Sequence, residues 1–293
     1  MIEILKAILF GIMEGITEWL PISSTGHMIL LDEFVKLNIS DNAALRDAFY
    51  SFFEVAIQLG AILAVILLYF RKLNPFASSK SPAEKKATWM LWLKILVALL
   101  PSVVLGFLLD DWMDAHLYNS VVVSIALIVY GIAFLFVEKI HAAKKWNLEP
   151  CDNVDDVSLK TALFIGAFQC LAMIPGTSRS GSTILGAMLL GLSRTAAAEF
   201  SFFLAIPTMA GAGVLRGYKF VRFLGETGTE MPGMAWVVLA VACTVAFLVS
   251  LAAIRFLTDF VKRHSFAPFG VYRIALGILV LLYFAPAQAK IVL

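Results

Sequence analysis

The sequence predicts an all-α protein that crosses a membrane several times and also carries two re-entrant helix hairpins. Of its 293 residues, 60% are hydrophobic and only 15% are charged, and the mean hydropathy is +0.87. Soluble domains carry about 25% charged residues, so this composition indicates an integral membrane protein. Six long apolar stretches and two interrupted ones are the second observation. The two interrupted stretches also resemble each other, which predicts an inverted-topology repeat.

Composition also excludes several classes of protein. A net charge of +2 and the lack of a basic tail give no reason to expect a nucleic-acid partner. The cysteines Cys151, Cys170 and Cys243 lie far apart, so they predict neither a disulfide framework nor a zinc site. Charged residues such as Glu3 and Lys6 interrupt the first apolar residues, so we do not expect a signal peptide there.

Six stretches are long enough to span a bilayer of about 30 Å, which needs about 20 apolar residues. They lie near Ala48–Phe70, Thr88–Leu109, Asn119–Glu138, Ala196–Tyr218, Ala235–Phe256 and Phe269–Pro286. Two further apolar stretches, near Ile4–Leu31 and Leu159–Leu192, are broken in the middle by proline and polar residues. Each half is too short to cross, so we expect each stretch to be a helix–loop–helix hairpin that returns to its own side.

The two interrupted stretches align with a slip of one residue before their prolines. Glu14 then falls on Gln169, Glu18 on Met173, and Pro21 on Pro175. Because three spans follow each hairpin, the second half must be inserted upside down relative to the first. We therefore expect one membrane domain over 1–293, with a first repeat of about 1–140, a linker of about 141–158 and a second repeat of about 159–293.

The distribution of Lys and Arg predicts the orientation, because these residues are enriched in cytoplasmic loops. Thirteen fall on one side of the predicted spans: Arg71, Lys72, Lys80, Lys85, Lys86, Lys139, Lys144, Lys145, Lys160, Arg194, Arg255, Lys262 and Arg263. Seven fall on the other: Lys6, Lys36, Arg46, Arg216, Lys219, Arg222 and Lys290. We expect the first side to be cytoplasmic and both termini to lie outside.

A polar loop in the second interrupted stretch predicts an anion site. It runs from Pro175 to Thr183 and contains one arginine among glycines and hydroxyls, of which we expect Gly176, Ser178, Arg179, Ser180 and Thr183 to contact the ligand. A turn that leads into a helix directs backbone N–H groups at one spot, here beside a guanidinium. Irregular backbone at membrane depth is tolerated only where it is buried in protein or lines a wet cavity. We expect the anion to be phosphate.

Glu14 and Glu18 are four residues apart and would share one face of a helix in the first hairpin. An ionised acid or an arginine at the bilayer centre costs about 2.5–3.5 kcal/mol, so we expect these glutamates and Arg179 to share one polar cavity. The alternative is that both glutamates lie at the interface on a surface helix. Pro21 and the polar run after it favour the site.

His27 follows Ser23 and Ser24 in the loop that mirrors the arginine loop. A serine beside a histidine is the minimal arrangement of nucleophile and base, so we expect Ser24 to be the nucleophile, His27 the base and Ser23 a substrate contact. The alternative is that His27 is a satisfied core residue, as we expect for the other histidines.

Other polar or small residues receive simpler interpretations. Gly11 and Gly15 indicate close helix packing. Buried ion pairs or snorkelling ends would explain Arg273, Lys94 and Glu54, which we leave outside the site. Gln58 and Glu199 follow the two hairpins and would support the site.

Taken together, these motifs resemble a known family, the bacterial undecaprenyl-diphosphate phosphatases of the bacitracin-resistance type. The resemblance lies in Glu14-x-x-x-Glu18, the run Leu20–His27 and the run Pro175–Thr183, and it extends essentially end to end, including Glu199–Phe202. It implies hydrolysis of undecaprenyl diphosphate to the monophosphate carrier lipid used in peptidoglycan synthesis. It also implies a bacterial inner-membrane location, an active site that opens to the periplasm, and a divalent cation.

The residues suit these implied roles. Arg179 would bind phosphate oxygens in a bidentate manner, and Glu14 and Glu18 would supply hard oxygen ligands to Mg²⁺ or Ca²⁺. Direct attack by His27 or by a metal-activated water stays open beside attack by Ser24. The alternative function is a transporter or flippase of an anionic lipid, because inverted repeats with broken helices are a transporter architecture. Whether the chain forms a homodimer is also open.

Overall fold

The structure, a computed structural model, describes residues 1–117, 119–142 and 150–289 of the chain. Two hairpins and a set of long helices make up the described residues. The first hairpin is α1 (Ile2–Thr17) with α2 (Ser24–Phe34), and the second is α7 (Leu159–Cys170), η2 (Leu171–Met173) and α8 (Arg179–Leu189). The long helices are α3 (Ala43–Leu68), α5 (Pro82–Leu117), α6 (Ser120–Ala142), α9 (Arg194–Thr227), α10 (Gly233–Val261) and α11 (Ala267–Ala289), with short α4 (Phe70–Leu73) and η1 (Val154–Asp156) between them.

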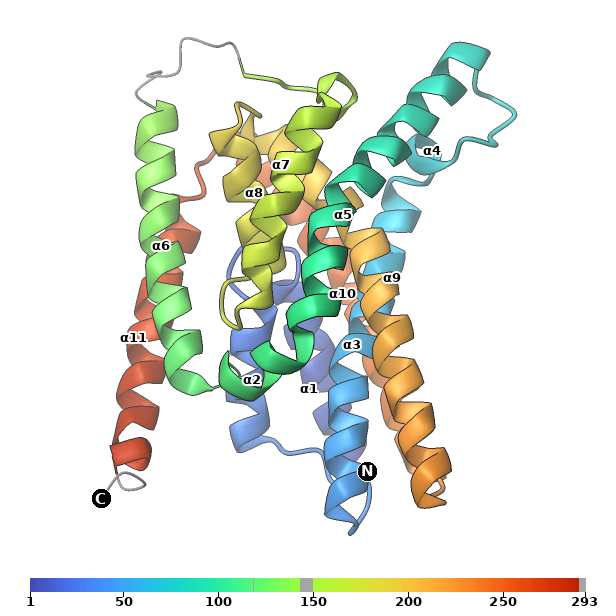
Figure 1. Ribbon diagram of the computed structural model, residues 1–293, viewed down its shortest axis with the longest axis vertical. Helices are drawn as coiled ribbons and strands as arrows, with labels where there is room; N and C mark the ends of the chain where they lie inside the picture. The colour runs from blue at the N-terminus through green and yellow to red at the C-terminus, as the bar shows by residue number, and fades with distance from the viewer. Residues whose placement is uncertain (118, 143–149, 290–293) are drawn as a thin grey trace.

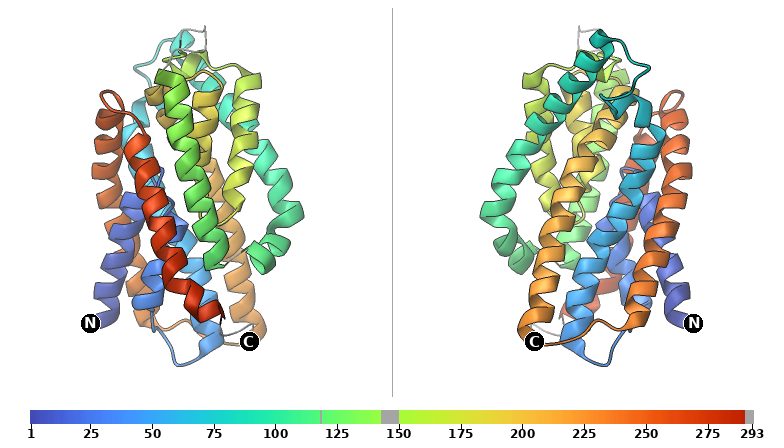
Figure 2. Two further views of the ribbon diagram at one scale, coloured as in Figure 1. Left: turned by 90° about the vertical axis from the view of Figure 1, so that its left-hand side faces the viewer. Right: turned by 90° about the vertical axis from the view of Figure 1, so that its right-hand side faces the viewer.

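All six predicted spans are confirmed as helices that are long and apolar enough to cross a membrane. The helices extend beyond the apolar stretches, because polar residues at their ends continue the helical backbone. Pro101 lies in the interior of α5 and Pro207 in the interior of α9. Proline removes a helical hydrogen bond and bends a helix. Figure 2 shows the resulting outward bow of α5.

The two interrupted stretches are confirmed as helix–loop–helix hairpins that enter the bundle from opposite ends. Figure 1 shows α1 and α2 in one half of the molecule and α7 and α8 in the other, so that their loops meet near the middle. The start of α1 and the end of α11 lie at the same end, and α4 and the start of α5 lie at the opposite end (Figure 1). An inverted repeat requires this arrangement, and the repeat itself stays a prediction.

Helix pairs of the two halves pack in a reciprocal way. The first hairpin packs through α1 on α10 of the second half, and the second hairpin packs through α7 on α5 of the first half, while α6 pairs with α11. The predicted close packing at Gly11 and Gly15 is confirmed, because an added Cβ would lie 2.6 Å from Ala242 O and 2.7 Å from Val249 Cβ. Small residues thus allow α1 to approach α10 closely.

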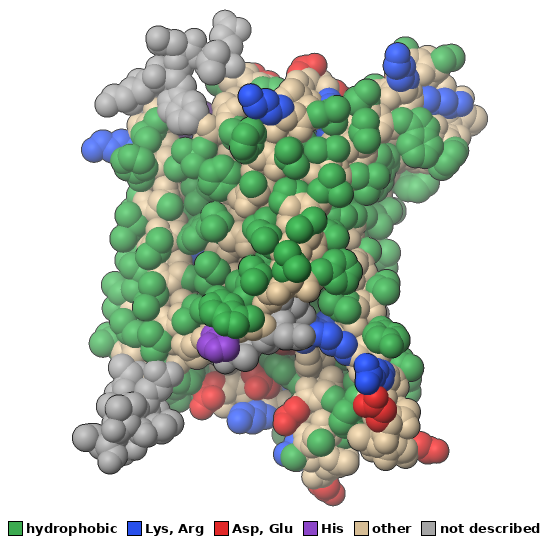
Figure 3. Space-filling model, viewed as in Figure 1, with side chains coloured by type: hydrophobic (Ala, Val, Ile, Leu, Met, Phe, Trp, Pro, Cys, Tyr) green, Lys and Arg blue, Asp and Glu red, His purple; other side chains and the backbone are tan. Residues whose placement is uncertain are grey.

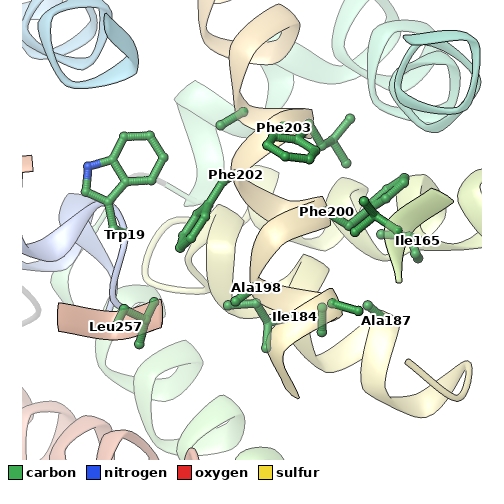
Figure 4. Packing of buried hydrophobic residues seen from close by; sticks show 14 of the residues in the cluster. Trp19, Ile165, Ile184, Ala187, Ala198, Phe200, Phe202, Phe203 and Leu257 are labelled. Atoms are coloured by element: carbon green, nitrogen blue, oxygen red, sulfur yellow. The ribbon is translucent and has the colours of Figure 1, made fainter. Parts of the chain in front are cut away.

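The core lies where the second hairpin meets α9 and the first loop. Figure 4 shows Trp19 of the first loop beside Phe202, and their rings meet edge to face at 5.5 Å. Phe200, which lies in α9 like Phe202, packs near Ile165 of α7 (Figure 4). The outer surface is apolar through the middle of the face in Figure 3, and charged side chains gather toward its ends. This is the surface expected of a membrane-spanning protein.

The charge comparison and the expected linker include residues outside the described part of the chain. Lys144, Lys145 and Lys290 of the charge comparison lie outside the described residues, and so does the middle of the expected linker, 143–149. The remainder of the linker contributes η1 and the residues before α7.

Candidate active site

The first loop begins where α1 ends, just after Thr17, and Glu18, the C-cap of α1, still has helical backbone angles. Pro21 disfavours a continued helix in the residue before it. Ser23 then adopts φ 76°, a conformation that is uncommon for a residue with a side chain. Its Oγ accepts a hydrogen bond from Gly26 N at 3.2 Å and so caps the start of α2. The loop therefore presents Ser24 as the first residue of a new helix.

The second loop repeats this geometry at Ser178, which has φ 75°. Ser178 Oγ accepts from Gly181 N at 3.1 Å and caps α8, whose first residue is Arg179. Ser23 and Ser178 are the described residues other than glycine with positive φ, and they are as far apart in sequence as Glu14 and Gln169. The alignment therefore needs no slip.

The pairing of Pro21 with Pro175 is wrong by one residue, and Pro21 corresponds to Gly176. The two prolines are not equivalent, because the capping serine follows Pro21 by two residues and Pro175 by three. In the structure, the capping serines occupy the equivalent backbone positions.

The expected meeting of the two hairpins at Glu18 and Arg179 is confirmed. Arg179 Nη2 donates to Glu18 Oε1 at 2.9 Å, and Ser24 Oγ donates to Glu18 Oε2 at 2.6 Å. Glu18 is 4% exposed, so its charge is balanced inside the protein by the guanidinium. One carboxylate thus joins the cation of the second hairpin to the hydroxyl of the first, and charge-assisted hydrogen bonds of this kind are short and strong.

Arg179 is held by a residue that the sequence analysis did not assign to the site. Its Nη1 donates to Ser201 O at 2.7 Å and to Ser201 Oγ at 3.3 Å, and Ser201 Oγ also contacts Thr183 Oγ1 at 2.6 Å. Thr183 is fully buried and supports the arginine through Ser201. The only signal for Ser201 in the sequence is its place in the run Glu199–Phe202.

Ser180 and Ser178 strengthen the contact between the two loops. Ser180 Oγ donates to Glu18 O at 3.0 Å and is 1% exposed. Ser178 Oγ lies 3.2 Å from Ser180 Oγ. Ser180 therefore joins the two loops, whereas Ser178 and Gly176 line a cavity beside Arg179.

Arg273 of α11 is a second residue that sequence reasoning left outside the site. It is fully buried, and it donates through Nη1 to Pro21 O at 3.1 Å and through Nη2 to Gly176 O and Thr177 O, both at 2.8 Å. Pro21 and Gly176 are the equivalent positions of the two loops. One guanidinium therefore fixes how far apart the loops lie.

The expected pair of Ser24 and His27 is not joined by a hydrogen bond. His27 Nδ1 lies 2.7 Å from Ser23 O, and its Nε2 lies 2.7 Å from the Tyr272 hydroxyl. Both ring nitrogens are thus engaged away from Ser24, whose hydroxyl contacts Glu18 instead. The role of His27 as a base stays a prediction.

Two cavities adjoin at the loops. One of about 800 Å³ is lined by polar and charged residues of α1, α2, α3 and α9 and reaches Glu14. The other, of about 620 Å³, is mainly apolar and runs between α5 and α9 past Glu18 and Arg179. Ser24, Thr25 and Gln58 line both, so Gln58 does lie beside the site.

Glu14 fits a cation site better than an interfacial position. It is 1% exposed and lines the polar cavity, and its Oε1 is buried without a hydrogen-bond partner. The interface alternative for Glu14 and Glu18 is therefore wrong. Among the described residues, no group of three or more His, Cys, Asp and Glu side chains could hold a metal alone. Two carboxylates with substrate oxygens and waters do suit Mg²⁺ or Ca²⁺, which take oxygen ligands.

Three further polar residues differ in their relation to the site: Glu199 and Lys94 lie away from it, whereas Glu54 lies in the polar cavity. Glu199 pairs with Lys72 at 3.1 Å, so the expected support from Glu199 is wrong. Lys94 Nζ donates to Asp155 O at 2.6 Å, and Glu54 lines the polar cavity.

Comparison with known proteins points to one family. Residues 7–279 match the family described as "Bacitracin resistance protein BacA". The chain is 54% identical to "Undecaprenyl-diphosphatase" of Limosilactobacillus fermentum, over 97% of this chain and 99% of that protein. It is also 54% identical to "Undecaprenyl-diphosphatase 1" of Clostridioides difficile, over 97% of each chain. The chain is likewise 54% identical to "Undecaprenyl-diphosphatase" of Streptococcus pyogenes serotype M4, over 96% of each chain.

Proposed function

The chain belongs to the bacitracin resistance protein BacA family, and from this membership we propose that it is an undecaprenyl-diphosphatase. The enzyme hydrolyses the terminal phosphate of undecaprenyl diphosphate and yields the monophosphate that carries peptidoglycan precursors. The observation that carries this proposal is the Glu18 carboxylate, which contacts the Arg179 guanidinium and the Ser24 hydroxyl at once. A nucleophile and a phosphate-binding cation thus lie at one point.

The two cavities fit the two parts of this substrate. The mainly apolar cavity between α5 and α9 suits the first isoprene units of the lipid, and it reaches exposed apolar residues such as Phe107. The polar cavity suits the diphosphate and the water that hydrolysis needs. Because both cavities meet at Ser24, a lipid lying in the first would present its phosphates at the hydroxyl.

The chemistry follows from the contacts of Ser24. Its Oγ attacks the terminal phosphorus while its proton passes to Glu18 Oε2, which lies 2.6 Å away. The bond from phosphorus to the bridging oxygen breaks, and undecaprenyl phosphate leaves as the anion. Water then hydrolyses the phosphoserine, Glu18 returns the proton to Ser24 Oγ, and inorganic phosphate is released. Arg179 balances the charge on the transferring phosphoryl group, because such reactions depend mainly on positioning and charge neutralisation.

Glu14 and Glu18 would hold the divalent cation together with oxygens of the diphosphate. When bound, Mg²⁺ or Ca²⁺ would supply Lewis-acid stabilisation of the phosphoryl oxygens. Two alternative routes are direct attack on phosphorus by His27 and direct attack by water. The hydrogen bond from Ser24 to Glu18 supports the serine route over both.

The transporter alternative is not favoured, because the relatives are named as diphosphatases and a transporter needs no nucleophile. We place the enzyme in the bacterial inner membrane with its polar cavity open to the periplasm. The support is that this cavity includes Lys6 of α1 and Arg46 of α3, two helices that start at the end of the molecule where the chain begins (Figure 1). The basic loops lie at the other end, and such loops are usually cytoplasmic.

A phosphate-release assay tests the proposal. The purified protein in detergent receives a polyprenyl diphosphate, and the released phosphate is measured with and without chelator. We expect release that depends on Mg²⁺ or Ca²⁺ and that Ser24→Ala lowers by at least about 100-fold, as for loss of other catalytic groups. No release from the wild-type protein would refute the phosphatase, and release unchanged by Ser24→Ala would refute the serine route.

A further inference from the structure

The two ring nitrogens of His27 have defined partners, and these partners fix its tautomer. Ser23 O is a backbone carbonyl and can only accept a hydrogen bond, so His27 Nδ1 must carry the proton and donate it. In the neutral ring, Nε2 then holds the lone pair and accepts from the Tyr272 hydroxyl at 2.7 Å. The rings of His27 and Tyr272 also stack at 5.7 Å, with 2° between their planes. A base for Ser24 would need this lone pair.

The second hairpin contains an equivalent contact made by a residue that cannot act as a base. Ser182 is four residues after Ser178, as His27 is four after Ser23, and Ser182 Oγ donates to Ser178 O at 3.0 Å. The side chain at this position thus binds the carbonyl of the positive-φ serine in both hairpins. In the second, a plain hydroxyl is sufficient for that contact.

The tyrosine also has a counterpart. Val129-Tyr130-Gly131-Ile132-Ala133 of α6 repeats as Val271-Tyr272-Arg273-Ile274-Ala275 of α11, with Gly131 in place of Arg273. The Tyr130 hydroxyl lies beside the Ser182 side chain, in the place that corresponds to the contact of Tyr272 with His27. At each hairpin loop, one side chain of the short helix that follows (α2 or α8) binds the capping serine, and one tyrosine of a long helix (α11 or α6) lies beside that side chain.

We propose that His27 and Tyr272 form a positioning pair, in which Tyr272 orients the His27 ring and Nδ1 holds the carbonyl of Ser23. The proposal rests on the proposed function and changes the expected role of His27 from base to support. Ser23 adopts φ 76°, which costs energy unless neighbouring groups hold it. Ser24 follows directly, so a relaxed Ser23 would carry the nucleophile away from Glu18 and from the substrate.

Replacement of His27 distinguishes support from base catalysis. His27→Ser places a hydroxyl where Ser182 has one, whereas His27→Ala differs from it by that single oxygen and leaves Ser23 O without the side-chain donor. We expect kcat for phosphate release to stay within about tenfold of wild type in His27→Ser and to fall about 100-fold in His27→Ala, since small misplacement of a reacting group can cost that much. Equal loss in the two variants would overturn the proposal.

Tyr272→Phe removes only the hydroxyl and keeps the stacked ring. We expect kcat to fall about tenfold with KM unchanged, because the phosphate contacts remain while the nucleophile is misplaced. The double variant His27→Ser with Tyr272→Phe should be no slower than His27→Ser, because a serine at position 27 is too short to reach the tyrosine. Tyr283→Phe on the same helix is the matched control, since Tyr283 packs on Phe34 and Phe284, and its kcat should equal that of wild type. An unchanged or increased kcat in Tyr272→Phe would contradict the proposal.

A measurement without turnover separates this proposal from the proposed function. In protein labelled with ¹⁵N-histidine, the Nε2 signal that disappears in His27→Ser belongs to His27. We expect that signal to shift in Tyr272→Phe and to stay in place in Ser24→Ala. The reverse pattern would show that Nε2 faces Ser24 and would overturn the positioning pair. If the wild-type protein released no phosphate, the proposed function would fail, while this spectrum would still decide the role of His27.

Discussion

A larger side chain at one position of α9 would fill the apolar cavity between α5 and α9 without disturbing the fold. Gly211 of α9 lines this cavity of about 620 Å³, and a Cβ built on it meets no atom within 4 Å. Gly211→Leu would therefore place a branched side chain in the space proposed for the first isoprene units. Replacing a helical glycine also favours the helix by up to about 1 kcal/mol, so loss of folding is not expected.

The expected loss of binding free energy follows from the number of lipid carbon atoms that the new side chain displaces. A leucine side chain has four carbon atoms, and in the cavity it would take the space of a similar number of lipid carbon atoms. At about 0.8 kcal/mol per buried CH₂, the lost contact is about 3 kcal/mol, which corresponds to roughly a hundredfold. Because the lost contact is present in the bound substrate and in the transition state alike, we expect KM to rise by this factor while kcat changes little.

The assay measures phosphate release against substrate concentration for a long-chain polyprenyl diphosphate and for a diphosphate ester of a very short alkyl chain. Only the long-chain substrate should lose affinity. Gly225→Leu is the matched control, since Gly225 also lies in α9 with no atom within 4 Å of its Cβ but does not line the cavity. Equal losses for the two substrates, or an unchanged KM for the long one, would show that the lipid does not lie between α5 and α9.

Three further changes test the rest of the site. Glu18→Gln keeps the size of the side chain but removes its charge, so we expect kcat at saturating substrate to fall about 10²–10⁴-fold; an unchanged kcat would exclude Glu18 as the proton acceptor. Arg273→Lys replaces a planar guanidinium that binds three carbonyls, so both kcat and the free energy of unfolding should fall, the latter by about 1–3 kcal/mol for groups left unpaired. Thermal unfolding in detergent and phosphate release measure the two, and a stable variant with full activity would contradict the bridging role. Glu14→Gln should raise the Mg²⁺ or Ca²⁺ concentration needed for half-maximal phosphate release, and an unaltered requirement would exclude Glu14 as a ligand.

The sequence predicted the site best where leaving two charged residues apart in the membrane would cost free energy. Glu18 and Arg179 could not lie separately in an apolar bundle without a large penalty, so their meeting followed from the sequence alone. The failed inference at Pro21 and Pro175 relied on a shared residue type. Backbone conformation was the better guide, because Ser23 and Ser178 have φ of 76° and 75° and cap their helices in the same way.

Apolar length and interruption by proline and polar residues determined the six spanning helices, the two hairpins and the joining of Glu18 with Arg179 where the hairpins meet. These features depend on transfer of side chains and backbone into lipid, which is local and can be read from a run of residues. Only the tertiary structure decided which hydrogen bond each polar group makes. Arg273 and Tyr272 lie far along the chain from the loops that they contact, and neither the spacing nor the residue type of His27 indicates that its lone pair faces a tyrosine. Such choices depend on distances between helices and on the direction of individual atoms, which exist only once the helices have packed.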